Sequence, residues 1–171
     1  MPNDSVDLLQ QLADREAIRE RLYRYCRSMD RVDAPLGQSI FHEDATADYG
    51  PIFKGRGRDM IEHICAVHTR KFLHHSHQLS NILIDLDGDK AGSEAYVTAT
   101  LRMMDDGRLQ QRTIWARYID QWSRRGNNWG IDNRRVLFDF DELRDVVGQN
   151  SHEDSRRDRG DPSYAAIRSV A

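Results

Sequence analysis

The chain has 171 residues and a formal net charge of −3, so its length suits a single domain with a proper hydrophobic core. Hydrophobic residues make up 39% of the sequence and charged residues 31%, a balance that is typical of a soluble globular protein. The weak negative charge gives no reason to expect nucleic acid or an anionic membrane as a partner, and no apolar run reaches the length of a membrane span.

The first third of the chain is predicted to be helical. Apolar residues recur there at steps of three and four, which indicates an amphipathic helix over residues 8–29; they are Leu8, Leu12, Ile18, Leu22, Tyr25, Cys26 and Met29. Pro35 ends this helix because proline disfavours helical backbone in the residue before it. A short helical piece over residues 36–41 is expected to follow.

A small hairpin and a second helix come next. The Gly50-Pro51 pair separates two short strands expected over residues 45–49 and 52–54. Glycines at positions 55 and 57 then turn the chain into a helix that is expected over residues 60–72, where apolar residues again repeat helically.

From residue 73 onward the apolar period changes to two, which predicts long β-strands. They are expected over residues 75–86, 91–104, 109–123 and 129–140, and turn sequences at 87–89, 105–107 and 126–128 separate them. Long strands joined by tight turns predict an antiparallel meander. A short helical remnant is expected after residue 141 and ends at residue 147.

Helices followed by long strands predict an α+β fold. In this fold a curved antiparallel sheet wraps around the N-terminal helices as a cone-shaped α+β barrel, and a cavity remains between them. The domain is expected to occupy residues 1–147. Residues 148–171 form a tail that is mostly polar, so we expect it to be mobile or to lie as an arm on a neighbouring subunit.

The cysteines and the N-terminus bear on the cellular compartment. Cys26 and Cys65 are the two cysteines of the chain, and each lies in a helix-like apolar pattern. We therefore expect reduced core thiols. Residues 1–10 lack the basic and apolar regions of a signal peptide, so the protein is predicted to be cytoplasmic.

Three histidines begin a strand that otherwise has the pattern of a core strand. His75 and His77 share one face by their spacing of two, and His74 takes the other. One of them can serve as a general base because imidazole titrates near neutral pH, although a polar strand end would carry the same residues. His63 and His68 lie nearby, but no carboxylate follows at a metal-ligand spacing, so no metal site is predicted.

Asp30 ends the apolar stripe of the first helix, where the helix dipole would favour a cation over a carboxylate. A carboxylate at this place indicates a specific partner such as an imidazolium, and the alternative is a surface aspartate. Four further residues lie on strands whose alternate positions face inward, where they would suit an anionic or oxyanion-forming ligand or simply form core: Tyr49, Trp115, Tyr118 and Arg134.

The layout and these residues resemble the SnoaL-like branch of the nuclear transport factor 2-like (cystatin-like) superfamily over about residues 8–140. Residues 25–30 look like the helix end that carries a tyrosine and an aspartate in bile acid 7α-dehydratases, and Tyr49 matches a second tyrosine there. His77 matches the catalytic histidine of those enzymes and of hexachlorocyclohexane dehydrochlorinase, in which it pairs with the aspartate at the helix end. Arg134 falls where both enzymes place a pocket arginine. Scytalone dehydratase is similar at a greater distance.

The resemblance implies a cofactor-independent lyase that eliminates water from a hydrophobic polycyclic carbonyl compound, with a 3-oxo-Δ4 steroid or bile acid bearing a 7α-hydroxyl as the leading substrate. His77 and Asp30 would form the acid–base pair, and Tyr25 and Tyr49 would stabilise the enolate. The expected substrate-binding residues are Arg134, Trp115, Leu101 and Met103. No cofactor, metal, nucleic acid or membrane is expected, and the partners are a small hydrophobic substrate and further copies of the chain, as a trimer or a dimer.

Two other functions stay open on the sequence. One is a different reaction of a SnoaL-like enzyme with the same pair, namely dehydrochlorination, isomerisation or polyketide cyclisation. The other is a non-catalytic binding module like the β subunit of a ring-hydroxylating dioxygenase, which shares this fold. A separation of His77 from Asp30, or their exposure to solvent, would favour the binding module.

Overall fold

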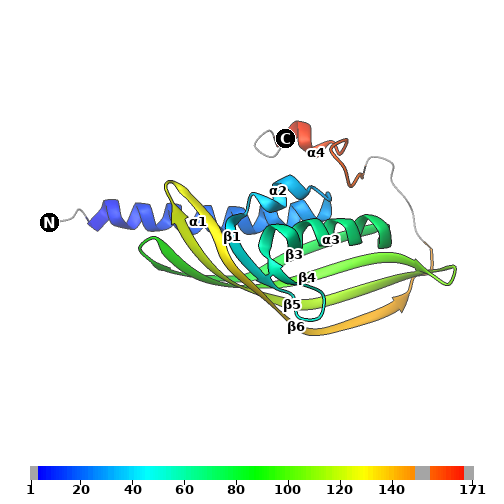
Figure 1. Cartoon of the computed structure of the whole chain (residues 1–171). Coiled ribbons are helices and arrows are strands. Elements are labelled where there is room, and N and C mark those ends of the chain that lie inside the picture. The colour runs from blue at the N-terminus through cyan, green and yellow to red at the C-terminus, as the bar shows by residue number, and fades with distance from the viewer. Residues whose placement is uncertain (1–3, 149–154, 168–171) are drawn as a thin grey trace.

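A computed structural model describes residues 4–148 and 155–167 (Figure 1). It has a mixed α+β fold in which helices cover one face of a curved sheet, as the sequence predicts. Four helices and six strands are present in these residues. In chain order they are α1 (Asp4–Asp30), α2 (Ala34–Gln38), β1 (Phe41–Asp48), β2 (Lys54–Arg56), α3 (Gly57–Lys71), β3 (His74–Asp87), β4 (Lys90–Asp105), β5 (Arg108–Arg125), β6 (Asn128–Asp145) and α4 (Ser163–Ala166).

The strands form one sheet in the order β2-β1-β6-β5-β4-β3. The meander from β3 to β6 is antiparallel throughout, and β1 and β2 form the expected antiparallel hairpin. The prediction of a fully antiparallel sheet is wrong at one place, because β1 pairs with β6 in parallel. Apolar periodicity within each strand predicts which face is buried, but it contains no information on which strands become neighbours.

Two predicted helical pieces also differ from the structure. The helical piece expected over residues 36–41 ends at Gln38, and Phe41 already begins β1. The helical remnant expected up to residue 147 is wrong, because β6 continues to Asp145 and remains paired with β5 to its end, where Gln110 lies opposite Asp145. The cross-strand hydrogen bonds of the long β5 extend β6 beyond the point where its apolar alternation stops.

The sheet is curved, and α1 and α3 lie against its concave side (Figure 1). Register shifts interrupt β5–β6 pairing between Trp115 and Ala116 and between Gln121 and Trp122, and such bulges bend a strand and increase its twist. The buried core lies between the helices and the sheet; it includes Ile18, Leu22, Met60, Ile61, Trp122 and Ile131. The first turns of α1 do not reach this core, so Leu8 and Leu12 remain exposed.

The described part of the C-terminal segment packs on its own chain. The Tyr164 hydroxyl donates to Asp33 Oδ2 at 2.7 Å, and Arg31 Nε lies 3.4 Å from Asp161 Oδ2. The Arg27 guanidinium lies 4.6 Å from the centre of the Tyr164 ring. Residues 155–167 therefore pack against the end of α1 and the start of α2 of their own chain. The remainder of the predicted tail lies outside the described residues.

Both cysteines are buried and free, in agreement with the predicted core thiols. Burial raises the pKa of the Cys26 thiol to about 12 and that of Cys65 to about 11, so neither forms a reactive thiolate near neutral pH. Among residues 4–148 and 155–167, no helix is both long and apolar enough to cross a membrane.

Candidate active site

A cavity of about 390 Å³ lies between the concave face of the sheet and helices α1 and α3. Most of its wall is apolar: Met29, Ile52, Ile64, Val67, Phe72, Val97, Ala99, Leu101, Ile114, Ala116, Val136 and Phe138. The polar side chains on the wall are Tyr25, Tyr49, His63, His68, Lys71, His77, Arg112 and Tyr118. An apolar cavity with a few converging polar groups is the usual form of a small-molecule site.

The structure pairs His77, which lines this cavity, with Asp30, which lies off the cavity wall. Asp30 is the last residue of α1 and His77 lies near the start of β3, 47 positions further along the chain. The His77 ring donates from Nδ1 to Asp30 Oδ1 at 2.7 Å. The main-chain N–H of His77 also donates to both carboxylate oxygens, at 3.0 and 3.1 Å. Since Nδ1 carries the proton, Nε2 has a lone pair with which it can accept a proton from a ligand.

Two more histidines, His68 and His75, lie next to the His77–Asp30 pair. His75 Nε2 donates to the carbonyl of Met29, and the His68 ring lies parallel to that of His77 at a centroid distance of 5.9 Å. Burial lowers the pKa of His68 to about 3 and that of His75 to about 4, so both rings are neutral at physiological pH. Of the three neighbouring histidines, His77 alone has a carboxylate partner in the described structure.

A second polar pair lies on the cavity wall. The hydroxyls of Tyr25 and Tyr49 are 2.7 Å apart and form a hydrogen bond, and the Tyr118 ring packs edge-on against Tyr25 at 5.5 Å. Burial raises the pKa of all three phenols, so they remain protonated donors over the neutral range. One hydroxyl of the pair donates to the other, which leaves the second O–H free to donate to a ligand.

Arg134, which was predicted to contact the substrate, does not line the cavity. The residue is fully buried, and its Nε and Nη2 donate to the two oxygens of Asp120, both at 2.7 Å. Its guanidinium lies 4.1 Å from the Tyr25 ring centre and 4.3 Å from that of Tyr118. Arg134 therefore supports the tyrosines from behind, with its charge already paired.

Two of the other three expected contact residues also lie elsewhere. Leu101 lines the cavity, but Met103, two positions further along β4, does not. Trp115 faces the opposite side of the sheet from its cavity-lining neighbours and stacks on Phe140 at a centroid distance of 4.8 Å. The alternation of side chains along a strand explains this, because Ile114 faces inward.

Tyr118, expected from its strand position to contact a ligand or form core, lines the cavity. His68, Lys71 and Arg112 also line it, although no contact with substrate was predicted for them. Tyr118 shares the inward alternation of Ile114, so that signal was present. His68 lies three residues after Cys65 on the apolar stripe of α3, which also placed it on the inner face. In the described part of the chain, no group of three or more histidine, cysteine, aspartate or glutamate residues could hold a metal ion.

A curved sheet encloses an apolar cavity under its helices, and the wall carries a tyrosine pair and a histidine that is paired with a carboxylate. These features define a small α+β barrel with a few polar groups in an apolar pocket. The chain belongs to the SnoaL-like domain family, whose sequence model matches residues 10–135. No curated protein matches the chain in a sequence comparison.

Solved structures similar to this one share its fold. A protein described as a "putative scytalone dehydratase" from Novosphingobium aromaticivorans DSM 12444 is 22% identical over 82% of this chain and 93% of its own, with a TM-score of 0.69. The hexachlorocyclohexane dehydrochlorinase LinA-type3 from Novosphingobium barchaimii LL02 is 18% identical over 84% of this chain and 97% of its own, with a TM-score of 0.72. A nuclear transport factor 2-like protein with a cystatin-like fold, also from N. aromaticivorans, is 22% identical over 81% and 91%, with a TM-score of 0.65.

Proposed function

We propose that the protein is a cofactor-independent lyase that eliminates water from a hydrophobic polycyclic carbonyl compound. The leading candidate substrate is a 3-oxo-Δ4 steroid or bile acid with a 7α-hydroxyl group. The observation that carries this proposal is the 2.7 Å contact of Asp30 with Nδ1 of His77, because His77 lies on the wall of an apolar cavity that also holds the Tyr25–Tyr49 pair. The names of two similar structures, a dehydratase and a dehydrochlorinase, agree with an elimination.

The first step is proton removal from carbon. His77 Nε2 accepts a proton that the enone acidifies, and the electron pair of the C–H bond moves into a dienolate. Asp30 keeps the ring in the tautomer with a lone pair at Nε2, and its negative charge stabilises the imidazolium that forms. Because His77 is only 8% exposed at its side chain and Asp30 18%, water screens this interaction weakly.

The second step is loss of the hydroxyl group. A phenol of the Tyr25–Tyr49 pair donates a hydrogen bond to the dienolate oxygen while negative charge is present there. The dienolate then collapses, the C–O bond breaks, and the cationic His77 returns its proton to the departing hydroxyl as water. The products are water and a conjugated dienone, and His77 is neutral again. The enone accepts and returns the electron pair, so the scheme requires no redox partner.

The shape and chemistry of the cavity suit such a substrate. Its volume of about 390 Å³ lies within the range of about 300–1,000 Å³ that is usual for drug-sized ligands. Aliphatic side chains from β4 and β5, such as Val97, Leu101 and Ile114, can pack against a ring system that has few polar atoms. A non-catalytic binding module would gain nothing from a paired histidine and carboxylate on such a wall.

Purified protein incubated with a 7α-hydroxy-3-oxo-Δ4 steroid tests the proposal. Elimination creates an extended conjugated dienone, so a new absorbance at longer wavelength should appear with the wild-type protein and not with His77→Ala. Absence of this absorbance with folded wild-type protein would reject the steroid dehydratase. Release of halide from a chlorinated cyclohexane would instead favour a dehydrohalogenase that uses the same pair.

We propose a homo-oligomer, with a trimer favoured over a dimer, in the cytoplasm. Apolar side chains that stay exposed on the first turns of α1, namely Leu8, Leu9 and Leu12, would be covered in such an assembly.

A further inference from the structure

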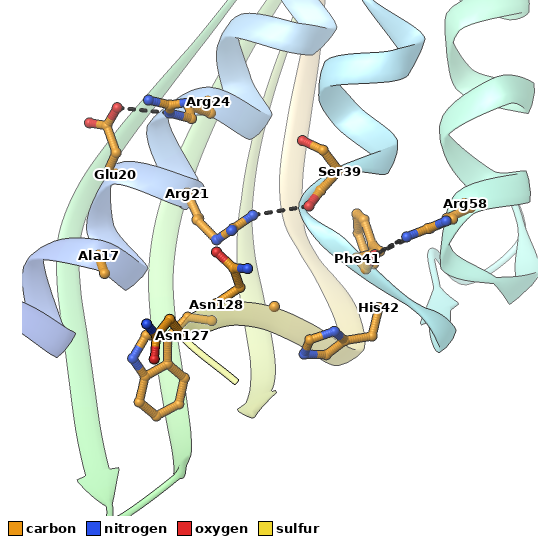
Figure 2. A pocket seen from close by; sticks show the side chains of 12 residues that line it. Ala17, Glu20, Arg21, Arg24, Ser39, Phe41, His42, Arg58, Asn127 and Asn128 are labelled. Atoms are coloured by element: carbon orange, nitrogen blue, oxygen red, sulfur yellow. Dashed lines mark hydrogen bonds and ion pairs between the residues drawn. The ribbon is translucent and has the colours of Figure 1, made fainter. Parts of the chain in front are cut away.

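A second cleft, of about 530 Å³, lies beside α1 and shares no lining residue with the active-site cavity (Figure 2). Four segments far apart in the sequence form it: the middle of α1, the start of β1, the first turn of α3 and the turn between β5 and β6. The polar side chains that line it include Glu20, Arg21, Arg24, Arg58, Asn127 and Asn128.

The charged side chains of this cleft are mostly positive. Three arginines line it, and Glu20 is the one carboxylate on its wall. Glu20 accepts a hydrogen bond from Arg24 Nε at 2.8 Å, so its negative charge is paired with that arginine. Arg58 donates to the carbonyl of Phe41 at 3.3 and 3.2 Å. Outside the lining, Glu43 lies 3.6 Å from Arg58.

Arg21 differs from its two neighbours. Its Nη1 donates to the main-chain carbonyl of Ser39 at 3.0 Å, and in the described chain no carboxylate forms an ion pair with it. Figure 2 shows the guanidinium of Arg21 reaching into the middle of the cleft. Burial and the like charge of Arg24 both lower the pKa of Arg21, which is the effect of a positive charge without a compensating anion.

Neutral donors face Arg21 from the other side of the cleft. Asn127 lies in the turn between β5 and β6, and Asn128 is the first residue of β6; both line the cleft. The His42 ring donates from Nε2 to the Ser123 carbonyl at 3.0 Å, which fixes it on the wall. Gly130 leaves the room for that ring, because a Cβ there would lie 2.6 Å from it.

We propose that this cleft binds the phosphate group of a small-molecule ligand, with Arg21 as the central contact. Guanidinium groups are the preferred partners of phosphate oxygens, which they meet with paired N–H donors. Arginine and asparagine side chains together offer more donors than the two oxygens of a carboxylate can accept. A tetrahedral phosphate, with three or four oxygens and up to two negative charges, matches this surplus of donors and positive charge.

Calorimetric titration of the full-length protein with inorganic phosphate at low ionic strength tests the proposal. Phosphate should bind the wild-type protein, and sodium acetate at the same ionic strength should bind much more weakly. Arg21→Gln should weaken phosphate binding by roughly tenfold or more, since it removes a charged hydrogen bond while the glutamine amide can still donate to Ser39. Glu20→Gln should have the opposite effect and strengthen binding by a few-fold, because the repelling charge is gone.

Arg19→Gln is the matched control. Arg19 lies on the same helix and pairs with Glu16 at 2.7 Å outside the cleft, so its loss changes the net charge by the same amount. The proposal fails if Arg19→Gln weakens phosphate binding as much as Arg21→Gln, or if the wild-type protein does not bind phosphate. Equal binding of acetate would overturn the assignment of phosphate. Thermal unfolding of each variant shows that it is folded before titration.

Discussion

Asp30 holds His77 at two places at once, because its carboxylate accepts the ring Nδ1–H at 2.7 Å and the main-chain N–H of the same residue at 3.0 and 3.1 Å. The ring contact sets the tautomer, and the main-chain contacts fix the strand that carries the ring. The end of α1 and the start of β3 are thereby joined at the point where the base must be placed.

Asp30→Asn should lower kcat on the proposed steroid by about 10²–10⁴-fold with little change in KM. The amide carries no negative charge, so it stabilises the His77 imidazolium far less than the carboxylate does. Steady-state kinetics measure the effect, and Asp7→Asn on the exposed face of α1 is the control. Wild-type kcat in the folded Asp30→Asn variant would contradict the role of the carboxylate.

Tyr25→Phe and Tyr49→Phe should each lower kcat by about 10–10³-fold, because a hydrogen bond to the dienolate is lost. Each change also leaves a buried hydroxyl without its 2.7 Å partner, so unfolding should become easier by about 1 kcal/mol. Tyr96→Phe removes the same atom from an exposed tyrosine and serves as the control in both kinetics and denaturation. If the two buried changes leave kcat at the level of this control, another group stabilises the enolate.

Arg134→Met should destabilise the protein by about 3–5 kcal/mol, because it leaves the Asp120 carboxylate buried without its partner. Urea denaturation measures the loss. Replacement of both residues, by Arg134→Met with Asp120→Leu, should recover much of it, since no uncompensated charge remains. Arg117→Met, at an exposed pair with Asp139, should cost far less. Equal losses for Arg134→Met and Arg117→Met would mean that the buried pair is not structural.

Because His68 and His75 are buried and neutral, the protein should become less stable in acid. The folded-state pKa values of about 3 for His68 and about 4 for His75 lie below the ordinary value of 6.5, so between these pKa values the unfolded chain binds protons that the folded chain does not. The free energy of unfolding should therefore fall as the pH drops from 6.5 to 5, by roughly 1.5 kcal/mol for each histidine.

Urea denaturation across this pH range tests the effect. His75→Gln keeps a donor for the Met29 carbonyl but removes the titrating ring, so its stability should fall less steeply with acid than that of the wild type. The exposed His63→Gln is the control and should keep the wild-type slope. A wild-type stability that stays constant from pH 6.5 to pH 5 would contradict the buried neutral rings.

The fold and the acid–base pair follow from local patterns in the sequence. The helical stripe that ends at Asp30 and the alternation that begins before His77 each predict one element correctly, and the resemblance brings the two residues together. The position of the Arg134 side chain cannot be predicted from such local patterns. Alternation places it on the inner side of β6, but its partner Asp120 and the covering Tyr25 ring come from other elements, and their packing decides that it lies behind the cavity wall.

Other differences arise from contacts distant in sequence. The parallel pairing of β1 with β6 joins segments that are separated by α3 and the whole meander. The C-terminal segment has a polar composition typical of a mobile tail, yet the Tyr164 hydroxyl donates a hydrogen bond to Asp33, 131 positions earlier. Tyr164 and the ion pair of Asp161 with Arg31 join this polar segment to the domain, and the average composition of the segment does not reveal such single residues.

The role of His77 as the base is tested most directly by measuring hydrogen exchange at carbon in a steroid that cannot eliminate water. A 3-oxo-Δ4 steroid without the 7α-hydroxyl should take up deuterium at C6 in D₂O when wild-type protein is present, because His77 can remove and return the proton there. Mass spectrometry should show this uptake with the wild type and only the background rate with His77→Ala. Equal uptake with both proteins, or none above background with the wild type, would contradict His77 as the base.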